Sequence, residues 1–396
     1  MNKIKTFNAI LMITGTSVGT GILGLPIVTS EAGFLPSLGA FLISWVFMTA
    51  AALYILDVKM RVRGNYNLSS MIKITLGKTG QLCSSTIVVL LLYALLCTYM
   101  MAGSAWFSVL LADFIVLPIF KIIIIFTLLF AVILYCGEKL IYNINNLLAF
   151  GLMVAFIITI GANIIPVNYN FLNQVNFREI LPSLPLLLTT FGFSIIVPAV
   201  TEYLEYDEKS AKFAILVGGV VALIAYIVWE WVVLSHIPLH GENSFQKLKE
   251  VGDNGTGVIL GFVAATKNEI ADVSGRVFAI FAAVTSFMGV SIALIHFLAD
   301  NLKIQAVGRK RLGLLILVYV PPLLITSLVP NAFVQVLSFA GIFVAVLLGL
   351  FPVLMIYKVG VSSKNKKQPK KIFLYITGVF FVLVIIQEII NLCFLS

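Results

Sequence analysis

The sequence predicts an all-α integral membrane protein with eleven transmembrane helices, the first and sixth of them broken. Of its 396 residues, 60% are hydrophobic and only 11% are charged, whereas soluble domains carry about 25% charged residues. Apolar segments follow one another along the whole chain, and two of them contain runs of glycine and hydroxyl residues. A water-soluble fold of this length could not bury so much apolar surface, so the bilayer must be its solvent.

Each expected span supplies about 20 mostly apolar residues, the length that crosses the hydrocarbon core. The first and sixth are weaker because glycine and polar residues interrupt them. The spans are expected near residues 7–30, 34–58, 82–112, 116–136, 145–166, 183–204, 211–236, 272–300, 312–329, 331–357 and 371–394. Residues 1–396 then form a single transmembrane domain, whose only long polar connections are 167–182 and 237–271.

The distribution of Lys and Arg predicts the orientation of the chain. With a cytoplasmic N-terminus, 20 of the 26 basic residues fall in cytoplasmic segments and 6 fall outside. The positive-inside rule therefore favours an inside N-terminus and, with eleven spans, an outside C-terminus. This pattern also accounts for the net charge of +9. Membrane lipid is the expected partner, nucleic acid is not, and the oligomeric state is left open.

Neither the N-terminal segment nor the cysteines indicate processing or a metal site. Residues 1–15 show no small-residue cleavage site after a short apolar run, so no removable signal peptide is expected. The four cysteines lack metal-ligand spacing and are expected to be ordinary buried thiols. They are Cys83, Cys97, Cys136 and Cys393.

The first span contains GTSVGTG at residues 15–21, which holds three glycines and three hydroxyl residues. Each glycine costs a helix about 1 kcal/mol relative to alanine, so we expect the helix to open here and to restart around Pro26. The sixth span repeats this pattern, with Thr189, Thr190, Gly192 and Ser194 followed by Pro198. In hydrocarbon, open backbone is tolerated only where protein or a watery cavity receives it.

Two broken helices five spans apart predict an inverted 5+5 repeat, over about 7–166 and 183–357, with 371–394 as an additional helix. The site then lies at the midplane between the breaks. Amides of Thr20, Gly21 and Ile22 would face an anion, and carbonyls near Gly15, Thr16 and Val18 would face a cation. Such a paired site suits a zwitterion.

Other interpretations of GTSVGTGILGLP at residues 15–26 are weaker. The spacing Gly-x-Gly-x-x-Gly is typical of dinucleotide binding, but no strand precedes it. The spacing Gly-x-x-x-Gly permits close helix packing, which explains two glycines but not the hydroxyl residues. The spacing Gly-x-Ser-x-Gly is that of a nucleophile elbow.

Four segments in chain order resemble the hydroxy/aromatic amino acid permeases, the tyrosine- and tryptophan-specific transport proteins of bacteria, within the amino acid/polyamine/organocation superfamily. They are GTSVGTGILGLPIVTSEAGFLPS at 15–37, LPLLLTTFGFSIIVPAVTEY at 184–203, AYIVWEWVVLSHIP at 225–238 and TSFMGVSIALIHFLAD at 285–300. The resemblance implies the fold of the bacterial leucine transporter and symport of an aromatic amino acid, usually tyrosine or tryptophan, across the inner membrane. Another neutral amino acid is the alternative substrate.

Mapped onto this chain, the resemblance implies a substrate site at both breaks. The carboxylate would meet amides of Thr20 and Gly21, the amino group would meet carbonyls near Thr16 and Thr190, and aromatic rings would line a side-chain pocket. The expected substrate-binding residues are Thr16, Ser17, Gly19, Thr20, Gly21, Thr190, Phe191, Gly192, Phe193 and Ser194. No catalytic residue, metal or cofactor is expected, and the coupling ion is H⁺ or Na⁺.

Candidates for ion coupling lie in three places. Ala282, Thr285 and Ser286 have the spacing that sodium-coupled members of the wider fold use together with two carbonyls of the first break, here those of Gly15 and Val18. Ordinary hydrogen bonding between helices explains the hydroxyl pair equally well. Ionisable residues within spans add Glu230 and His296, which we expect to be solvated near the outer and inner membrane surfaces respectively.

The remaining acidic residues have structural interpretations. Glu388, outside the repeats, is assigned to structure or an oligomer contact. The run Glu202, Glu205, Asp207 and Glu208 is typical of a solvated face, and could pair with Lys5 or the 59–63 cluster as an inner gate.

Two function classes compete with a transporter. An intramembrane serine protease would need Ser17 within hydrogen-bond reach of His296, although the expected topology separates them in depth. A channel would not need a cleft for a zwitterion. The chain has no nucleotide-binding motif that would support ATP-driven transport.

Overall fold

The computed structural model describes residues 3–64, 66–112, 114–163, 167–252, 255–266, 268–305, 308–362 and 371–394, and these residues are almost entirely helical. Ten of the helical segments are long and apolar enough to cross a membrane. The pair α1 (Lys3–Ser17) and α2 (Gly21–Thr29) makes an eleventh span, bent by 54°. The predicted all-α architecture with eleven spans is therefore confirmed.

The span boundaries follow the hydropathy pattern, with extensions at the polar ends. The continuous spans are α3 (Phe34–Arg61), α4 (Leu68–Leu111), α5 (Ile119–Cys136), α6 (Glu138–Asn163), α10 (Glu208–Leu234), α13 (Glu269–Leu302), α14 (Gly308–Leu328) and α17 (Lys371–Phe394). The tenth span joins α15 (Phe333–Val344), a π-helical turn (Ala345–Leu350) and α16 (Phe351–Ser362). The sixth joins η1 (Phe177–Ser183), α8 (Leu184–Thr190), η2 (Gly192–Ile196) and α9 (Val197–Tyr203).

The α4 helix begins earlier than the predicted span, which starts at residue 82. It is bent at Gly77, whose φ of 86° lies in the left-handed region. Glycine accepts this conformation at little cost because it has no Cβ. The polar turns before Gly77 therefore approach the bundle at an angle, and the apolar part of α4 crosses it.

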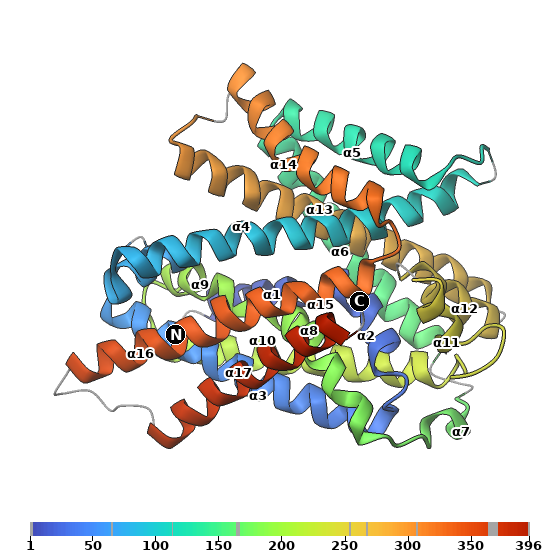
Figure 1. The fold of residues 1–396 in the computed structure, drawn as a ribbon, viewed down its shortest axis with the longest axis horizontal. Coiled ribbons are helices and arrows are strands. Elements are labelled where there is room, and N and C mark those ends of the chain that lie inside the picture. The colour runs from blue at the N-terminus through green and yellow to red at the C-terminus, as the bar shows by residue number, and fades with distance from the viewer. Residues whose placement is uncertain are drawn as a thin grey trace.

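The long helices lie roughly side by side, and their packing separates two groups (Figure 1). The α1 and α3 helices both pack on α10, and α8 and α9 also contact α3. In the second group α13 packs on α4 and α6, while α14 packs on α4 and α5. The α5, α13 and α14 helices lie over α4 at the top of the view.

The two polar connections contain short helices that sequence reasoning treated as loops. These are α7 (Tyr169–Leu172), α11 (Phe245–Glu250) and α12 (Thr256–Thr266), which gather at the right-hand end of Figure 1. The α12 helix is apolar but too short to span a bilayer, and it packs on α13 and α2 instead. The connection after α10 thus covers one end of the broken first span.

The prediction that all four cysteines are buried is wrong for three of them. Only Cys97 is buried, whereas Cys83, Cys136 and Cys393 are exposed on their helices, and no disulfide joins the four. The reason is that the outward faces of membrane helices meet lipid rather than protein, so an apolar position in a span need not be a buried one.

Candidate functional site

The first span is broken at the glycine-rich segment, as predicted. The α1 helix ends at Ser17 and α2 starts at Gly21. A Cβ added to Gly19 would lie 2.8 Å from the hydroxyl oxygen of Ser286, and one added to Gly21 would lie 2.8 Å from a methyl carbon of Thr190. Glycine is therefore required here for close approach to α13 and α8 as well as for a weak helix.

Thr20 joins the first break to α13 by two hydrogen bonds. Its backbone amide donates to the Ser286 hydroxyl at 3.1 Å, and its own hydroxyl donates to the Ala282 carbonyl at 2.9 Å. The side chain of Thr20 has no exposed surface. These bonds join the two helix groups at the level of the break.

The second break also lies where the sequence predicts it. The α8 helix ends at Thr190, a 3₁₀ segment runs from Gly192 to Ile196, and α9 begins at Val197 with Pro198 in its first turn. Proline is favoured there because it has no backbone N–H, and the N–H groups of the first turn have no partner within the helix in any case. The sixth span thus resumes as an α-helix at Val197, with the proline in its first turn.

Tyr226 of α10, which sequence reasoning missed, connects the two breaks. Its hydroxyl lies 2.6 Å from the Ser17 carbonyl oxygen and 2.9 Å from the Thr190 carbonyl oxygen. Both carbonyls end a half-helix and so carry the negative end of a helix dipole. A buried tyrosine hydroxyl usually finds such a partner. The signal in the sequence was the one tyrosine of α10, which lies within the apolar run of residues 213–229.

The predicted anion-binding amides are not all available. The Thr20 amide is bonded to Ser286, and the Ile22 amide donates to the Gly19 carbonyl at 3.2 Å. The expectation that they are unpaired is therefore wrong for these two, because a 3₁₀-type turn and a side chain from α13 take up the first donors of α2.

The hydroxyl groups predicted near the cation end turn back onto their own helices. Thr16 donates to the Met12 carbonyl at 2.8 Å, Ser17 to the Ile13 carbonyl at 3.2 Å, and Thr190 to the Leu187 carbonyl at 2.8 Å. Gly15 and Thr16 are exposed, and a Cβ on Gly15 would meet nothing within 4 Å. The last turn of α1 therefore faces open space.

The residues predicted to line a side-chain pocket are packed inward. The rings of Phe191 and Phe193 have no exposed surface. Phe191 meets the ring of Tyr226 edge-on at 5.0 Å between centroids, and Phe193 lies 3.3 Å from where a Cβ on Gly219 would be. Ser194 is also buried, while Gly192 is partly exposed. In this conformation both rings are held against α10.

The hydroxyl and carbonyl groups predicted as ion ligands are occupied by neighbours. The Ala282 carbonyl and the Ser286 hydroxyl bind Thr20, and the Thr285 hydroxyl donates to the Phe281 carbonyl at 2.7 Å. Val18 is partly buried at the break itself. Of the hydroxyl pair, Ser286 thus makes an interhelical hydrogen bond, whereas Thr285 bonds its own helix.

Glu230 is not the solvated residue that was expected. Its side chain has no exposed surface, and its Oε1 is hydrogen-bonded to the Thr29 hydroxyl at the end of α2. The prediction was wrong because it placed Glu230 only by its distance along the helix. That distance gives the depth of a residue in the membrane, but it does not say which other helices cover the side chain. Helix α2 packs on this side of α10 and excludes water.

His296 is exposed, as expected, and belongs to an exposed face of α13. Gly289, Ala293, His296 and Asp300 are all exposed and recur at helical spacing. Together with Ser286 they form one face of α13, which runs from the first helix break toward the C-terminal end of α13. Small and polar residues are unusual on a lipid-facing surface, so this face is suited to a watery path.

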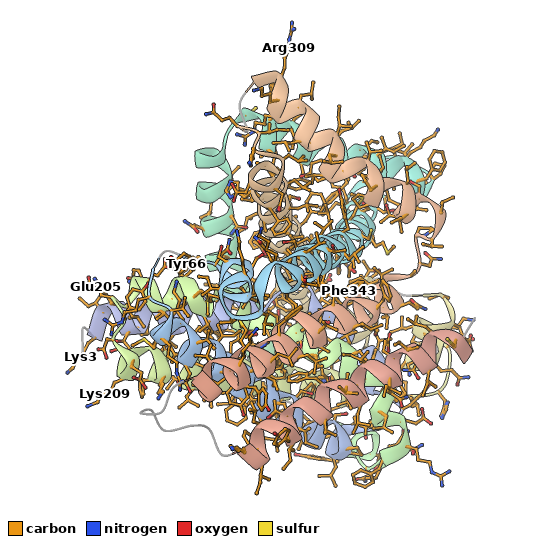
Figure 2. All side chains as sticks on the ribbon, turned by 60° about the vertical axis from the view of Figure 1, so that its left-hand side comes forward. Lys3, Tyr66, Glu205, Lys209, Arg309 and Phe343 are labelled. Carbon is orange, nitrogen blue, oxygen red and sulfur yellow. The ribbon has the colours of Figure 1, made fainter. Side chains whose placement is uncertain are left out.

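Ion pairs join helices at the end of the molecule where α1 begins. Figure 2 shows Lys3, Tyr66, Glu205 and Lys209 at this end. Lys5 pairs with Glu205, which confirms the predicted pairing, and the hydrogen bond from Lys5 holds the pKa of the Glu205 carboxyl below its usual value.

The second predicted pair at this end is also present. Lys59, on α3, has no exposed surface and pairs with Glu202. Its ammonium group also donates to the carbonyls of Gly64 and Tyr66, at 2.7 and 2.8 Å. Glu202 in the last turn of α9 and Glu205 just after it thus bind α3 and α1 rather than forming only a solvated face.

The opposite end is covered by the polar connections. Glu31, which follows α2, pairs with Lys249 of α11 at 2.9 Å. The side-chain amide of Gln174 donates to the Glu31 carbonyl at 2.7 Å, and Gly255 lies against Leu23. The α2 half of the first span is therefore held under these segments.

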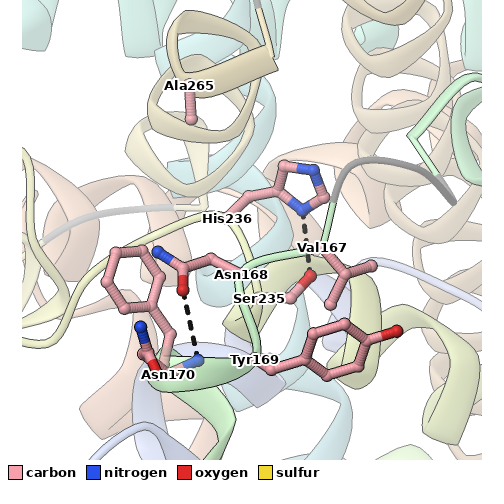
Figure 3. A pocket seen from close by; sticks show the side chains of 8 residues that line it. Val167, Asn168, Tyr169, Asn170, Ser235, His236 and Ala265 are labelled. Atoms are coloured by element: carbon pink, nitrogen blue, oxygen red, sulfur yellow. Dashed lines mark hydrogen bonds between the residues drawn. The ribbon is translucent and has the colours of Figure 1, made fainter.

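A separate pocket of about 580 Å³ lies at this end, beyond α10 (Figure 3). Asn168, Tyr169, Ser235 and His236 line it with Ala265 of α12. The imidazole of His236 is bonded to the Val232 carbonyl at 2.7 Å. Because it lies outside the helix breaks, this pocket is distinct from the candidate site.

Glu388 of α17 is buried at 3% exposure and accepts a long hydrogen bond from Asn391 at 3.4 Å. It therefore has a local partner in its own helix, away from both breaks.

A multi-pass helical bundle with two broken spans that meet in its interior defines a membrane transport protein, not an enzyme. The geometry also removes the protease alternative, since the Ser17 hydroxyl bonds its own helix while His296 lies ten residues beyond Ser286 on α13. The profile of the tryptophan/tyrosine permease family matches residues 2–395. The chain belongs to this family.

Relatives match over most of their length. The chain is 27% identical to the tyrosine-specific transport system 1 of Haemophilus influenzae, over 91% of this chain and 90% of that protein. It is 25% identical to the tryptophan-specific transport protein of the same organism, over 96% and 93% respectively. It is also 25% identical to glutamine transporter 2 of Aliivibrio fischeri, over 89% of each chain.

Proposed function

We propose that this permease is a secondary active symporter that imports an aromatic amino acid, tyrosine or tryptophan, across the bacterial inner membrane. The observation that carries the proposal is the meeting of two helix breaks at Tyr226, where two half-helix carbonyl ends face one another. Carbonyl oxygens with this orientation suit an ammonium group, and the positive dipole end of α2 suits a carboxylate. Relatives named for tyrosine and tryptophan transport support the substrate class.

The packing of the bundle supports transport by alternating access between two helix groups. The group of α1, α3, α8, α9 and α10 would rock against the group of α4, α5, α13 and α14. In this conformation the end near Glu31 is covered, whereas Gly15, Thr16 and the exposed face of α13 lead toward the end with Lys5 and Glu205. With a cytoplasmic N-terminus, this is an inward-facing state.

A second candidate substrate is a neutral amino acid other than an aromatic one. The similarity to a protein named glutamine transporter 2 favours this alternative, and Phe191 and Phe193 expose no ring surface to an aromatic ligand in this conformation. A channel would show a substrate-gated current much larger than the uptake flux.

The experiment is uptake of radiolabelled tyrosine, tryptophan and glutamine into proteoliposomes, under an imposed proton gradient or sodium gradient. We expect saturable accumulation of an aromatic amino acid under one gradient only. Accumulation of glutamine alone would transfer the function to the second candidate, and no counterflow of any of the three in folded protein would refute the proposal.

A further inference from the structure

We propose that Glu230 and Thr29 form a proton-binding site. In this site the Glu230 carboxyl is protonated while α2 lies against α10, and it loses its proton to water when the two helices separate. The transport consequence of this proposal rests on the proposed symport, but the protonation itself does not.

The environment of Glu230 does not stabilise an ionised carboxylate. Its side chain has no exposed surface, and its second oxygen, Oε2, has no hydrogen-bond partner among the described residues. None of the six ion pairs found in the described part of the chain includes it. An isolated buried carboxylate is so costly that the group binds a proton instead.

Glu31, two residues after Thr29, is paired with Lys249, and the charged groups on the helices that pack against α10 lie farther along those helices. Helix α2 has no titratable side chain, and α7 has only Tyr169. Phe156 of α6 meets the neighbouring Trp229, and Phe41 of α3 meets Tyr226. From those contacts, the titratable residues of α6 and α3 begin 13 or more residues away, or about 20 Å along a helix.

The other titratable groups on these elements lie near the opposite end of α10 or on the turns beside Glu230. They are Lys3 and Lys5 of α1, Tyr54, Asp57, Lys59 and Arg61 of α3, Glu202 and Tyr203 of α9, Glu208, Lys209, Lys212 and Tyr226 of α10, and His236 after α10. The Tyr226 hydroxyl and His236 Nδ1 are bonded to backbone carbonyls and not to Glu230.

Counting hydrogens at Thr29 supports the same assignment. The Thr29 hydroxyl lies 2.7 Å from the Leu25 carbonyl and also contacts Glu230 Oε1. A threonine hydroxyl has one hydrogen and a carbonyl has none. The Thr29 hydroxyl is placed to donate to both oxygens, but its one hydrogen cannot satisfy both. A protonated Glu230 that donates to the Thr29 oxygen leaves the threonine hydrogen for Leu25.

The site lies at a contact that must change during transport. Thr29 is the last residue of α2, next to the Glu31–Lys249 pair that closes this end. When α2 moves away from α10, water reaches Glu230, solvates the carboxylate and accepts the proton. Protonation then favours the closed contact, and ionisation favours the open one.

The first test is infrared difference spectroscopy on wild type, Glu230→Gln and Glu388→Gln. Glu388 is the matched control because it is also buried, at 3% exposure. In protein held inward-facing near neutral pH, we expect a protonated carboxylic acid band that Glu230→Gln removes and that is distinct from any band removed by Glu388→Gln. Loss of a carboxylate band instead would overturn the proposal. Thr29→Val, which keeps the acid, should shift the band of Glu230 without removing it.

The second test compares counterflow with accumulation in proteoliposomes. Glutamine at position 230 imitates the protonated acid, since its amide can donate to Thr29. We expect Glu230→Gln to retain counterflow within about twofold, while accumulation under an imposed proton gradient falls at least tenfold. Accumulation equal to wild type would overturn the transport role. If wild type itself showed no counterflow, the proposed function would fail, and the infrared result would still decide the proton site.

Discussion

The hydroxyl of Tyr226 lies 2.6 Å from the carbonyl oxygen of Ser17, the last residue of α1. It also reaches the carbonyl of Thr190, at the end of α8. One side chain of α10 thus holds the carbonyl ends of both broken helices. Because a phenol has one hydrogen, it satisfies these two acceptors only by sharing, which leaves acceptor capacity at the centre of the bundle.

Replacing Tyr226 with Phe should weaken substrate binding and stability together. The change strands two buried carbonyls, and an unsatisfied buried acceptor costs about 1–3 kcal/mol. We expect a lower melting temperature and an apparent affinity at least several-fold weaker, measured by thermal unfolding and binding. Tyr93→Phe is the control, since it also removes a hydroxyl bonded to a carbonyl, that of Leu317, but far from the breaks. Equal affinity losses in both variants would contradict a role at the site.

Enlarging Gly21 should close the site. An added Cβ would lie 2.8 Å from the Thr190 methyl carbon, while one on Gly15 would meet nothing. We expect Gly21→Leu to abolish uptake, Gly21→Ala to reduce it strongly and Gly15→Ala to leave it largely intact. Combining Gly21→Ala with Thr190→Ser, which removes the methyl group, should restore part of the activity. Saturable uptake by Gly21→Leu at wild-type level would refute the site assignment.

The hydrogen bond of the Thr20 hydroxyl should matter more for transport than the size and shape of the Thr20 side chain. Thr20→Val removes the shorter of the two hydroxyl bonds to the Ala282 carbonyl, whereas Thr20→Ser keeps it. Losing this hydrogen bond costs about 1–2 kcal/mol. We therefore expect transport efficiency to fall roughly tenfold in the valine variant and to stay near wild type in the serine variant. Concentration series of initial uptake rates would test this. Similar rates in both variants would show that the bond to α13 is dispensable.

Removing one member of the Lys59–Glu202 pair should destabilise the protein more than removing both. Lys59 has no exposed surface, so Glu202→Gln leaves a buried charge with only two carbonyl partners. We expect a loss of about 1–3 kcal/mol, part of which the additional change Lys59→Met recovers. The exposed Glu208–Lys212 pair is the control, because Glu208→Gln should cost less than about 0.5 kcal/mol. A double variant no more stable than Glu202→Gln would contradict this.

The Lys5–Glu205 pair should contribute little to any pH dependence of transport near neutrality. Its hydrogen bond lowers the pKa of Glu205 in the folded protein. The stabilisation is therefore fully present above the unfolded pKa, about 4.3, and is lost as pH falls through the lower folded value. Thermal unfolding of wild type and Glu205→Gln should differ by a constant amount above about pH 5 and converge only in more acidic buffer. Convergence between pH 5 and 7 would mean that the pair is absent in solution.

Local chemistry makes several elements predictable from the order of residues alone. Glycine and hydroxyl residues at 15–21 weaken a helix whatever surrounds it, so the first break could be placed, and Pro198 could be recognised as the start of a new helical segment. The acidic residues after the sixth span could be matched to Lys5 and the 59–63 cluster because all lie at the same end of their spans. The short helix α12 was missed because eleven apolar residues fit a loop as well as a helix.

The sequence by itself determined the number of spans, the two breaks and the family, since each depends on composition and order along the chain. Only the tertiary structure decided that Tyr226 joins the breaks, that Thr20 docks on Ala282 and that Glu230 is buried against Thr29. These contacts join residues 36 to 262 positions apart. They depend on which face of each helix meets which neighbour, and an almost uniformly apolar span does not encode that face, because lipid-facing and protein-facing positions have the same hydrophobicity.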